Sequence, residues 1–273
     1  MMNDEKQYMV LLTRPLARTS GEDELHQLLN GAGIIVEEVP MITFALPPDL
    51  RELDSALERA ARGEFESIIL SSPTAVNFFE LRARKLGLLD AIRSHMRAGT
   101  IGEATARELD RLGFEIQLPI PADAGSREFA QLLSGYDLAG KHVLLLQSQI
   151  GLDTISNALH DIGAIPERVT LYHTNGPTPH DAARLIALMQ STERPDVIAF
   201  FSPSAVTQFA QTLTGTGLLD NLPALAAIGT TTANAIEEIL HRTPEIVAQK
   251  ADQFSLANEI IGYLEMICYP NSN

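Results

Sequence analysis

The sequence predicts an α/β protein in which an open, mostly parallel sheet flanked by helices is built twice. Two observations carry this prediction. Short, uniformly apolar stretches alternate with helical segments along the 273 residues, as expected for strands covered by helices on both faces. The motif Ser-Pro-x-Ala-Val also occurs twice, at residues 72–76 and 202–206, which lie 130 residues apart. A chain of this length accommodates two ordinary domains.

Four strands are predicted from composition alone. They are residues 9–12, 67–70, 142–146 and 197–201. Helical spacing is clearest after the second Ser-Pro motif, where Val206, Phe209, Ala210 and Leu213 follow the i, i+3, i+4, i+7 pattern of one helical face. The alternation of such strands and helices predicts an open α/β sheet.

Other features recur in the same order in both halves. Helical segments close at Gly33 and Gly163, which are also 130 residues apart and suit helix C-termini. The further recurring pairs are 22–33 with 153–164, 34–44 with 165–174, 101–113 with 228–240, and 125–133 with 253–261. Two copies are too few for a solenoid, so we interpret the repeat as a duplicated domain. The extended stretches after the two glycines are either internal strands or paired linkers between lobes.

Composition and charge disfavour several functional classes. The net charge of −15 argues against nucleic acid and anionic membranes as partners. No apolar run reaches the roughly 18–20 residues of a membrane span, and the N-terminal residues show no signal-peptide pattern. Cys268 is the single cysteine, so an intrachain disulfide is impossible and a reducing cytosol fits best. We therefore expect a cytoplasmic protein.

The Ser-Pro motifs fall where ligands bind in open α/β sheets, beyond the carboxyl ends of the strands. Ser72 and Ser202 suit helix N-caps, and Pro73 and Pro203 suit the first helical position. Helix capping alone explains both motifs. The same geometry, however, leaves backbone N–H groups that attract anions without any basic side chain.

Two Ile-Gly segments repeat this arrangement. Gly102 and Gly229 are expected to permit tight turns, and Thr105, Thr231 and Thr232 place hydroxyls in the first helical turns. Capping is again the alternative. Four such turns on two facing lobes would let an acidic protein bind a polyanion in a cleft through backbone dipoles.

Several common motifs are absent from the sequence. There is no G-x-x-x-x-G-K-[ST] loop, no G-x-G-x-x-G after a strand and no G-x-S-x-G elbow. The seven histidines show no metal-binding spacing. We expect neither a cofactor nor a metal.

Together, these motifs resemble the uroporphyrinogen-III synthase family. The matching segments are "TRP" (13–15), "SSPTAV" (71–76), "IGEATA" (101–106), "FSPSAV" (201–206), "IGTTTA" (228–233) and the tyrosine of "RVTLYHT" (168–174). Each is short, and the order over nearly the whole chain makes the resemblance specific. It implies two α/β lobes joined by a two-stranded linker. Lobe one would comprise residues 1–39 and 175–273, and lobe two residues 40–174, with linker strands near 34–44 and 165–174.

The resemblance also implies an activity. The family cyclises hydroxymethylbilane, a linear tetrapyrrole with eight carboxylates, with inversion of ring D and loss of water. A spirocyclic pyrrolenine is the proposed intermediate, and no cofactor or metal takes part. The implied protein is a cyclising lyase of porphyrin and haem biosynthesis that acts on a small molecule, and we expect it to be a monomer.

Site residues follow from matching positions in the motifs. Tyr172 matches the family's linker tyrosine and is implied to donate a proton or hydrogen bond to the departing hydroxyl. Arg14 is implied to pair with a substrate carboxylate. The substrate-binding residues implied in this way are Arg14, Ser71, Ser72, Thr105, Ser202, Ser204, Thr231 and Thr232.

One segment departs from the family pattern. Many members carry Arg-Gly after the strand that opens the second half, and a further arginine shortly afterwards. Gln147 and Ser148 replace that pair here, and Leu152 stands where the later arginine often falls. A synthase-like module that binds a tetrapyrrole or another polyanion with weakened catalysis is therefore the alternative. A two-lobed solute-binding protein would also look similar, although the missing signal peptide disfavours it.

Overall fold

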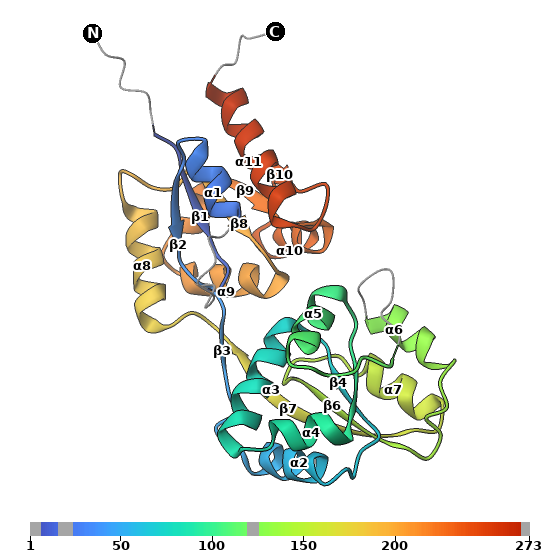
Figure 1. Ribbon diagram of the computed structural model, residues 1–273. Helices are drawn as coiled ribbons and strands as arrows, with labels where there is room; N and C mark the ends of the chain where they lie inside the picture. The colour runs from blue at the N-terminus through green and yellow to red at the C-terminus, as the bar shows by residue number, and fades with distance from the viewer. Residues whose placement is uncertain (1–6, 16–23, 119–125, 269–273) are drawn as a thin grey trace, which may run out of the picture. The chain divides into compact units, whose positions relative to one another are not determined.

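The computed structural model describes residues 7–15, 24–118 and 126–268. The chain divides into two compact units, which are named unit 1 (Met1–Thr43 and Asn175–Asn273) and unit 2 (Phe44–Thr174). The sequence-based boundaries lie after residues 39 and 174. Figure 1 labels most of the elements of both units.

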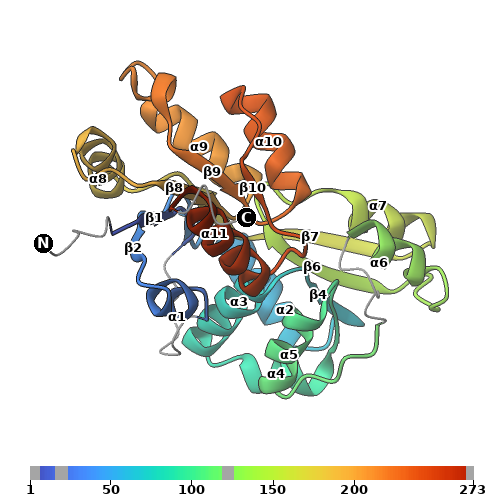
Figure 2. The same cartoon turned by 90° about the horizontal axis from the view of Figure 1, so that it is seen from above.

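The sheet of unit 1 has the strand order β10-β9-β8-β1-β2, and every neighbouring pair is parallel. Its strands are β1 (Met9–Leu12), β2 (Ile35–Glu38), β8 (Val197–Phe200), β9 (Ala224–Ala227) and β10 (Ile246–Val247). Its helices are α1 (Glu24–Gly31), α8 (Pro179–Gln190), α9 (Pro203–Leu213), the 3₁₀ turn η1 (Leu218–Asn221), α10 (Thr230–Leu240) and α11 (Gln253–Cys268). Figure 2 shows α9 and α10 side by side.

Helices cover both faces of this sheet. Val10 and Leu12 share a hydrophobic cluster with residues of α1 and α11, whereas Leu11 between them belongs to the cluster under α8, α9 and α10. Because successive strand side chains point to opposite faces, a strand buried on both sides must be apolar throughout. The prediction of β1 and β8 as strands covered on both faces, which was based on their uniformly apolar composition, is confirmed in this way.

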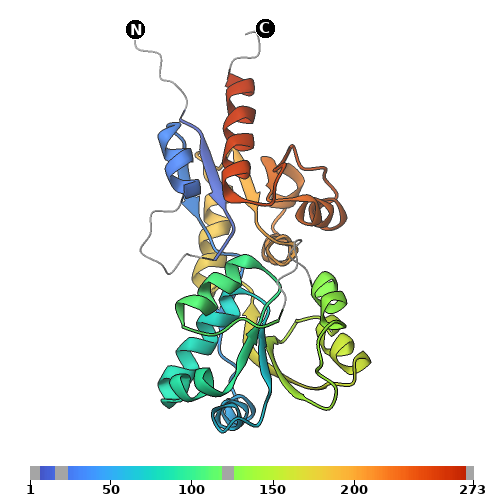
Figure 3. The ribbon, with the colours of Figure 1, turned by 45° about the vertical axis from the view of Figure 1, so that its right-hand side comes forward.

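The sheet of unit 2 has the strand order β3-β7-β6-β4-β5. Its strands are β3 (Thr43–Ala45), β4 (Ser67–Leu70), β5 (Arg97–Gly99), β6 (His142–Ser148) and β7 (Ile165–Asn175). Its helices are α2 (Arg51–Ala61), α3 (Pro73–Leu86), α4 (Leu89–His95), α5 (Glu103–Arg111), α6 (Ser126–Leu133) and α7 (Thr154–Asp161). One hydrophobic cluster lies under α2 to α5 and another under α6 and α7. Figure 3 shows the two groups of helices on opposite sides of the sheet.

The sequence repeat appears as a repeated strand order. The run β2-β1-β8-β9 in unit 1 corresponds to β7-β6-β4-β5 in unit 2. Unit 1 thus combines β1 and β2 from the first half of the chain with three strands from the second half. Unit 2 combines β6 and β7 from the second half with three strands from the first half. Gly33 and Gly163 adopt φ values of +76° and +77° after α1 and α7, which confirms their predicted place at helix ends.

The predicted linkers differ from the structure in one respect. Residues 35–38 of the first stretch are not a bridge, because they form β2, the edge strand that pairs in parallel with β1. Only β3 and the end of β7 pass from one unit's residues to the other's, and these two strands are neighbours in the sheet. The amino-acid composition of residues 34–44 did not distinguish β2 from β3, the segment that passes between the units, because both are extended and partly apolar.

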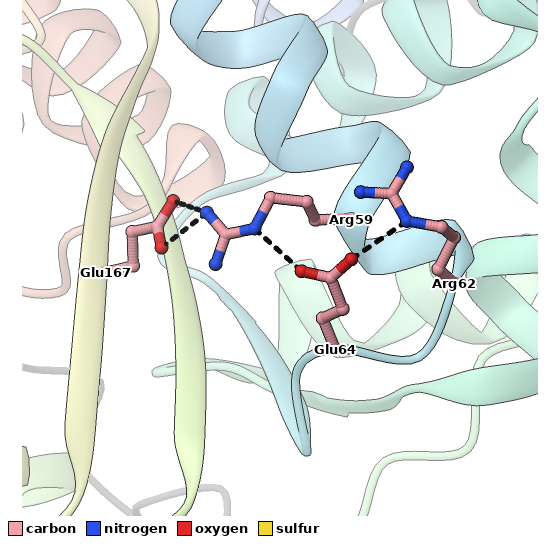
Figure 4. Close-up of polar contacts among 4 residues, drawn as sticks. All are labelled: Arg59, Arg62, Glu64 and Glu167. Atoms are coloured by element: carbon pink, nitrogen blue, oxygen red, sulfur yellow. Dashed lines mark hydrogen bonds and ion pairs between the residues drawn. The ribbon is translucent and has the colours of Figure 1, made fainter.

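An ion-pair network attaches β7 to α2 (Figure 4). Arg59 Nη1 donates to both carboxylate oxygens of Glu167 at 2.8 Å, and Arg59 Nε donates to Glu64 at 2.9 Å. Arg62 Nε also donates to Glu64, at 2.8 Å. The hydrogen bonds from Arg59 and Arg62 lower the pKa of Glu64. Because Glu167 lies on β7, the network helps to fix the strand that carries Tyr172.

No helix in the described part of the chain combines the length and the apolar character that a bilayer crossing requires.

Candidate active site

The carboxyl edge of the unit 2 sheet brings together several of the predicted residues. Strand β4 pairs in parallel with β5 and β6, and β6 pairs in parallel with β7, so the carboxyl ends of these strands meet at one edge. Ser71 and Ser72 follow β4, and Ser148 ends β6 opposite Tyr172 of β7. Thr105 lies in the first turn of α5, the helix after β5.

Ser72 is the N-cap of α3, as predicted. Its backbone is extended (φ −156°, ψ 158°), and its Oγ accepts a hydrogen bond from the Ala75 N–H at 3.1 Å. Pro73 opens the helix, where its missing N–H costs nothing. The cap therefore fixes the position of the serine oxygen at the sheet edge.

Strand β7 carries a bulge beside this cap. Gln147 of β6 lies opposite Thr170, but the next residue, Ser148, lies opposite Tyr172, so Leu171 has no partner on β6. Leu171 and Tyr172 consequently both belong to the hydrophobic cluster under α2 to α5, although they are consecutive residues. Bulges re-aim side chains and are frequent beside active sites. Here the bulge turns the tyrosine toward α3.

The Tyr172 ring is held by two aromatic neighbours. It stacks on Phe78 with a centroid distance of 5.3 Å and meets Phe44 edge-on at 5.5 Å. The residue is 8% exposed, and its Oη lies 3.4 Å from Ser72 Oγ. Packing of this kind restricts the ring while leaving the phenol at the N-terminus of α3. Phe44 and Phe78 were missed in the sequence, because nothing in their local pattern points to the tyrosine.

The loop after β6 holds the end of β7. The Gln149 N–H donates to Tyr172 O at 3.1 Å. Its side-chain amide forms two bonds with Thr174: Nε2 donates to the carbonyl at 2.9 Å, and Oε1 accepts from the N–H at 2.8 Å. The side-chain amide of Gln149 thus forms the two backbone hydrogen bonds of Thr174 that a neighbouring strand would otherwise form. Arg168 Nη2 adds a bond to Gly151 O at 2.8 Å. Sequence reasoning missed Gln149, for which no local signal exists.

The residues that depart from the family pattern, Gln147, Ser148 and Leu152, lie partly in the interior and partly at the surface. Gln147 is 3% exposed, and among the described residues its Nε2 has no hydrogen-bond partner. Thr100 Oγ1, after β5, is in the same situation within the described ranges. Leu152, by contrast, is 72% exposed. An apolar side chain therefore occupies the surface at the place where an arginine was expected.

The corresponding edge of unit 1 carries the remaining predicted residues. Ser202 caps α9 with nearly the geometry of Ser72 (φ −164°, ψ 156°), and its Oγ accepts from the Ala205 N–H at 3.2 Å. Arg14 follows β1 and is not a solvated loop charge. It is buried, its Nη2 donates to Glu38 Oε1 at 3.0 Å, and its guanidinium lies 5.4 Å from the centre of the Phe201 ring. A substrate carboxylate at Arg14 would have to share it with Glu38.

The threonines occupy two kinds of position. Thr105 and Thr232 lie in the first turns of α5 and α10 and are each 3% exposed, whereas Thr231 is exposed. Ser204, in the first turn of α9, is half-buried. Burial leaves the hydroxyls of Thr105 and Thr232 little access to a ligand in this conformation.

The two N-cap glycines differ from expectation in their backbone. Gly102 has φ −166° and Gly229 has φ 173°, which is extended conformation open to any residue. Neither is needed for a left-handed turn. Both helices begin without a side-chain cap. In α10, the Thr232 N–H donates to the carbonyl of the N-cap residue Gly229 at 3.1 Å.

In the described ranges, no group of three or more His, Cys, Asp or Glu side chains could hold a metal ion. The predicted site residues at these edges present hydroxyls, a phenol, backbone N–H groups and the guanidinium of Arg14.

Comparison with known proteins decides the family. The model of the family described as uroporphyrinogen-III synthase HemD matches residues 23–258. The chain belongs to the uroporphyrinogen-III synthase family. The resemblance drawn from the short motifs is thereby confirmed.

Relatives in the uroporphyrinogen-III synthase family are identical to this chain at somewhat more than a quarter of the aligned residues. The uroporphyrinogen-III synthase of Synechococcus elongatus is 29% identical over 235 residues, covering 81% of this chain and 83% of its own length. That of Chlorobaculum parvum is 26% identical over 178 residues, covering 64% of this chain and 71% of its own.

Solved structures of uroporphyrinogen-III synthases have the same fold. A mutant Thermus thermophilus uroporphyrinogen III synthase superposes with a TM-score of 0.63 at 19% identity, covering 95% of this chain and 98% of its own. The Helicobacter pylori uroporphyrinogen-III synthetase gives a TM-score of 0.59 at 17% identity, covering 95% and 100%. The predicted fold class, two α/β lobes with mostly parallel sheets, is confirmed.

Proposed function

We propose that this protein closes hydroxymethylbilane to uroporphyrinogen III, with inversion of ring D and loss of water. The observation that carries the proposal is the family match over residues 23–258. The surroundings of Tyr172 support it, because a restrained phenol at a helix N-terminus is suited to proton donation beside an anionic substrate.

Tyr172 is the proposed proton donor. The carbon–oxygen bond of the hydroxymethyl group breaks with its electron pair on oxygen, and the phenol proton converts the departing hydroxide to water. The nitrogen lone pair of the adjoining pyrrole supplies electrons to the carbon left behind. The substituted carbon of ring D bonds to this carbon and gives the spirocyclic pyrrolenine. The bond from that ring carbon to its original bridging carbon then breaks, and the bridging carbon bonds to the unsubstituted α-carbon of ring D, which releases the proton that restores the phenol. Atoms and charge balance, with water as the only second product.

Positioning is the other part of the proposed catalysis. The unaided bilane closes without inversion, so the enzyme must hold ring D where its substituted carbon attacks first. Orientation of reacting groups supplies a large part of many enzymatic rate accelerations. In this proposal the enzyme orients the substrate through its carboxylates, which bind to groups at the carboxyl edge of each sheet.

Backbone dipoles are the proposed carboxylate partners. The starts of α3 and α5 in unit 2, and of α9 and α10 in unit 1, each follow a strand at the carboxyl edge. One helix terminus contributes only about 0.3–1 kcal/mol toward a surface charge, so several must act on a substrate with many carboxylates. Ser71, Ser204 and Thr231 lie in or beside these first turns and supply hydroxyls.

Individual side chains differ in what they supply. Arg14 is the proposed basic partner on unit 1, with Glu38 released or shared on binding. We assign Ser202 a binding role through its helix. Thr105 acts through its backbone N–H group rather than its buried hydroxyl. Thr232, whose N–H already donates to the Gly229 carbonyl at 3.1 Å, acts through the dipole of α10.

The proposal extends to location and assembly. We expect a cytoplasmic monomer without nucleic-acid or membrane partners, in keeping with the net charge of −15. The alternative, a tetrapyrrole-binding module with weakened catalysis, rests on Gln147, Ser148 and Leu152. It is disfavoured because the bulge, Phe44 and Phe78 all serve to place one phenol.

The proposal is tested by product analysis. Purified protein is mixed with freshly prepared hydroxymethylbilane, the products are oxidised to porphyrins, and the isomers are separated by chromatography. A synthase gives predominantly the type III isomer. A binding module slows or leaves unchanged the spontaneous closure to type I.

A further inference from the structure

We propose that Ser72 is a positioning residue for Tyr172: its hydroxyl donates a hydrogen bond to the phenol oxygen and thereby leaves the phenol proton directed at the substrate. The inference rests on the proposed function of Tyr172. It gives Ser72 a role that is neither substrate contact nor helix capping alone.

The helix cap determines which way the Ser72 hydroxyl can act. A serine hydroxyl has one hydrogen and two lone pairs. The Ala75 N–H, 3.1 Å away, occupies a lone pair and holds Oγ in place. The hydrogen is left to point elsewhere, and Tyr172 Oη lies 3.4 Å away. Catalytic hydrogen bonds are often long without substrate and tighten when it binds, which fits this separation.

The phenol has only one proton to give. If Tyr172 donates to Ser72, that proton is unavailable to the leaving hydroxyl. If Ser72 donates to Tyr172, the phenol proton is free for the substrate. The ring cannot turn away to another arrangement easily, because Phe78 stacks on it and Phe44 packs against its edge. Substrate binding therefore selects the arrangement in which Ser72 is the donor.

The same contact stabilises the charge that develops during proton transfer. As Tyr172 gives up its proton, negative charge accumulates on Oη, in a residue only 8% exposed. The Ser72 O–H and the N-terminus of α3 both present positive charge to it. Ser72 keeps its own proton throughout, so it acts through Tyr172 and does not itself react.

The duplicated unit shows that capping does not require this contact. Ser202 caps α9 through Ala205 as Ser72 caps α3 through Ala75. The position that lies 130 residues before Tyr172 is Ile42, which is buried and has no hydroxyl. Within the described residues, no hydrogen bond joins Ser202 to a tyrosine. One fold therefore contains the cap with the phenol and the cap without it.

The test compares Ser72→Gly with Ser202→Gly and Ser72→Thr. Glycine is tolerated at an N-cap, so the first two variants lose a hydroxyl while keeping most of the helix stability. We expect Ser72→Gly to have a kcat about 10- to 100-fold below that of Ser202→Gly, the loss typical of a hydrogen bond to a charged group. Any loss from Ser202→Gly falls mainly on KM. Ser72→Thr keeps the hydroxyl and restores kcat to within a few-fold of the wild type.

Two further variants separate positioning from folding. Thr178→Gly removes the N-cap of α8, a helix that carries none of the proposed site residues, and retains wild-type activity. In a Tyr172→Phe background, Ser72→Gly causes no further fall in kcat, because the group through which it acts is already missing.

A spectroscopic readout tests the hydrogen bond itself. The ultraviolet resonance Raman doublet of tyrosine reports whether a phenol donates or accepts, and the Tyr172 contribution is obtained by subtracting the spectrum of Tyr172→Phe. We expect Ser72→Gly to shift this doublet and Ser202→Gly to leave it unchanged.

The outcomes distinguish the two proposals. If the wild type forms only the type I isomer, the proposed function fails and the role of Ser72 fails with it. If the wild type forms the type III isomer but Ser72→Gly and Ser202→Gly have equal kcat values, the synthase assignment stands and the positioning role is wrong. A further loss from Ser72→Gly in the Tyr172→Phe background would also overturn it.

Discussion

Replacing Tyr172 with phenylalanine removes one oxygen and little else. The contacts with Phe78 at 5.3 Å and Phe44 at 5.5 Å are made by the ring and persist in the variant. Among the described residues, the hydrogen bond that the phenol loses is the 3.4 Å contact with Ser72 Oγ, which keeps its bond to the Ala75 N–H. A net hydrogen bond contributes about 0.5–1.5 kcal/mol, and this long one should lie at the lower end. We expect the free energy of unfolding to fall by less than about 1 kcal/mol.

Activity should change far more than stability in this variant. General acid catalysis typically contributes about 10²- to 10⁴-fold, so kcat for type III formation should fall by that factor, or roughly 3–5.5 kcal/mol in activation free energy. Urea unfolding measures the first quantity and a stopped assay with isomer separation the second. Tyr263→Phe, on α11 of unit 1, is the matched control and should retain activity. A Tyr172→Phe enzyme within threefold of the wild type would refute the reasoning.

Three further predictions concern the scaffold of unit 2. Phe79→Ala, at a fully buried position of α3, should lower the free energy of unfolding by about 3–5 kcal/mol in urea titrations, and a loss below about 1 kcal/mol would contradict the packing. Arg111, with Arg84, lowers the pKa of Glu80, so this carboxylate stabilises the fold above about pH 4.5 and the stabilisation is lost as pH falls through its lowered pKa. Glu80→Gln should therefore show a flatter loss of melting temperature between about pH 5 and pH 3; an unchanged acid branch would count against the pairing. Gln149→Leu should accelerate hydrogen exchange at the Thr174 amide, measured by mass spectrometry or NMR, and unchanged protection would rule out the side-chain clamp.

Most of the fold is predictable from the sequence because it depends on local composition. A strand covered on both faces needs apolar side chains at every position, so 9–12 and 67–70 could be located to the residue. A serine followed by proline has few better places than a helix start, and both Ser72 and Ser202 are N-caps. The repeat predicted a duplicated α/β domain, and the two sheets share the strand order β2-β1-β8-β9 and β7-β6-β4-β5.

The candidate site was less predictable because its contacts join distant segments. The bulge at Leu171 exists only through pairing with β6, and no local pattern encodes it. The Gln149 clamp on Thr174 likewise requires the finished sheet. In the sequence, nothing distinguishes Arg14 from a charged loop residue. Its ion pair with Glu38 depends on the position of β2 beside β1. Tyr172 itself was singled out through the family resemblance, and its relation to Ser72 emerged only from the structure.

The type III fraction of the porphyrin formed from hydroxymethylbilane is the deciding measurement. Freshly prepared substrate is divided among increasing concentrations of the purified protein, with heat-denatured protein as the control, and the oxidised products are resolved by chromatography. The type III fraction should rise with protein concentration to near completeness, while the denatured control yields type I. A product that stays type I at every protein concentration would contradict the assignment of this chain as a uroporphyrinogen-III synthase.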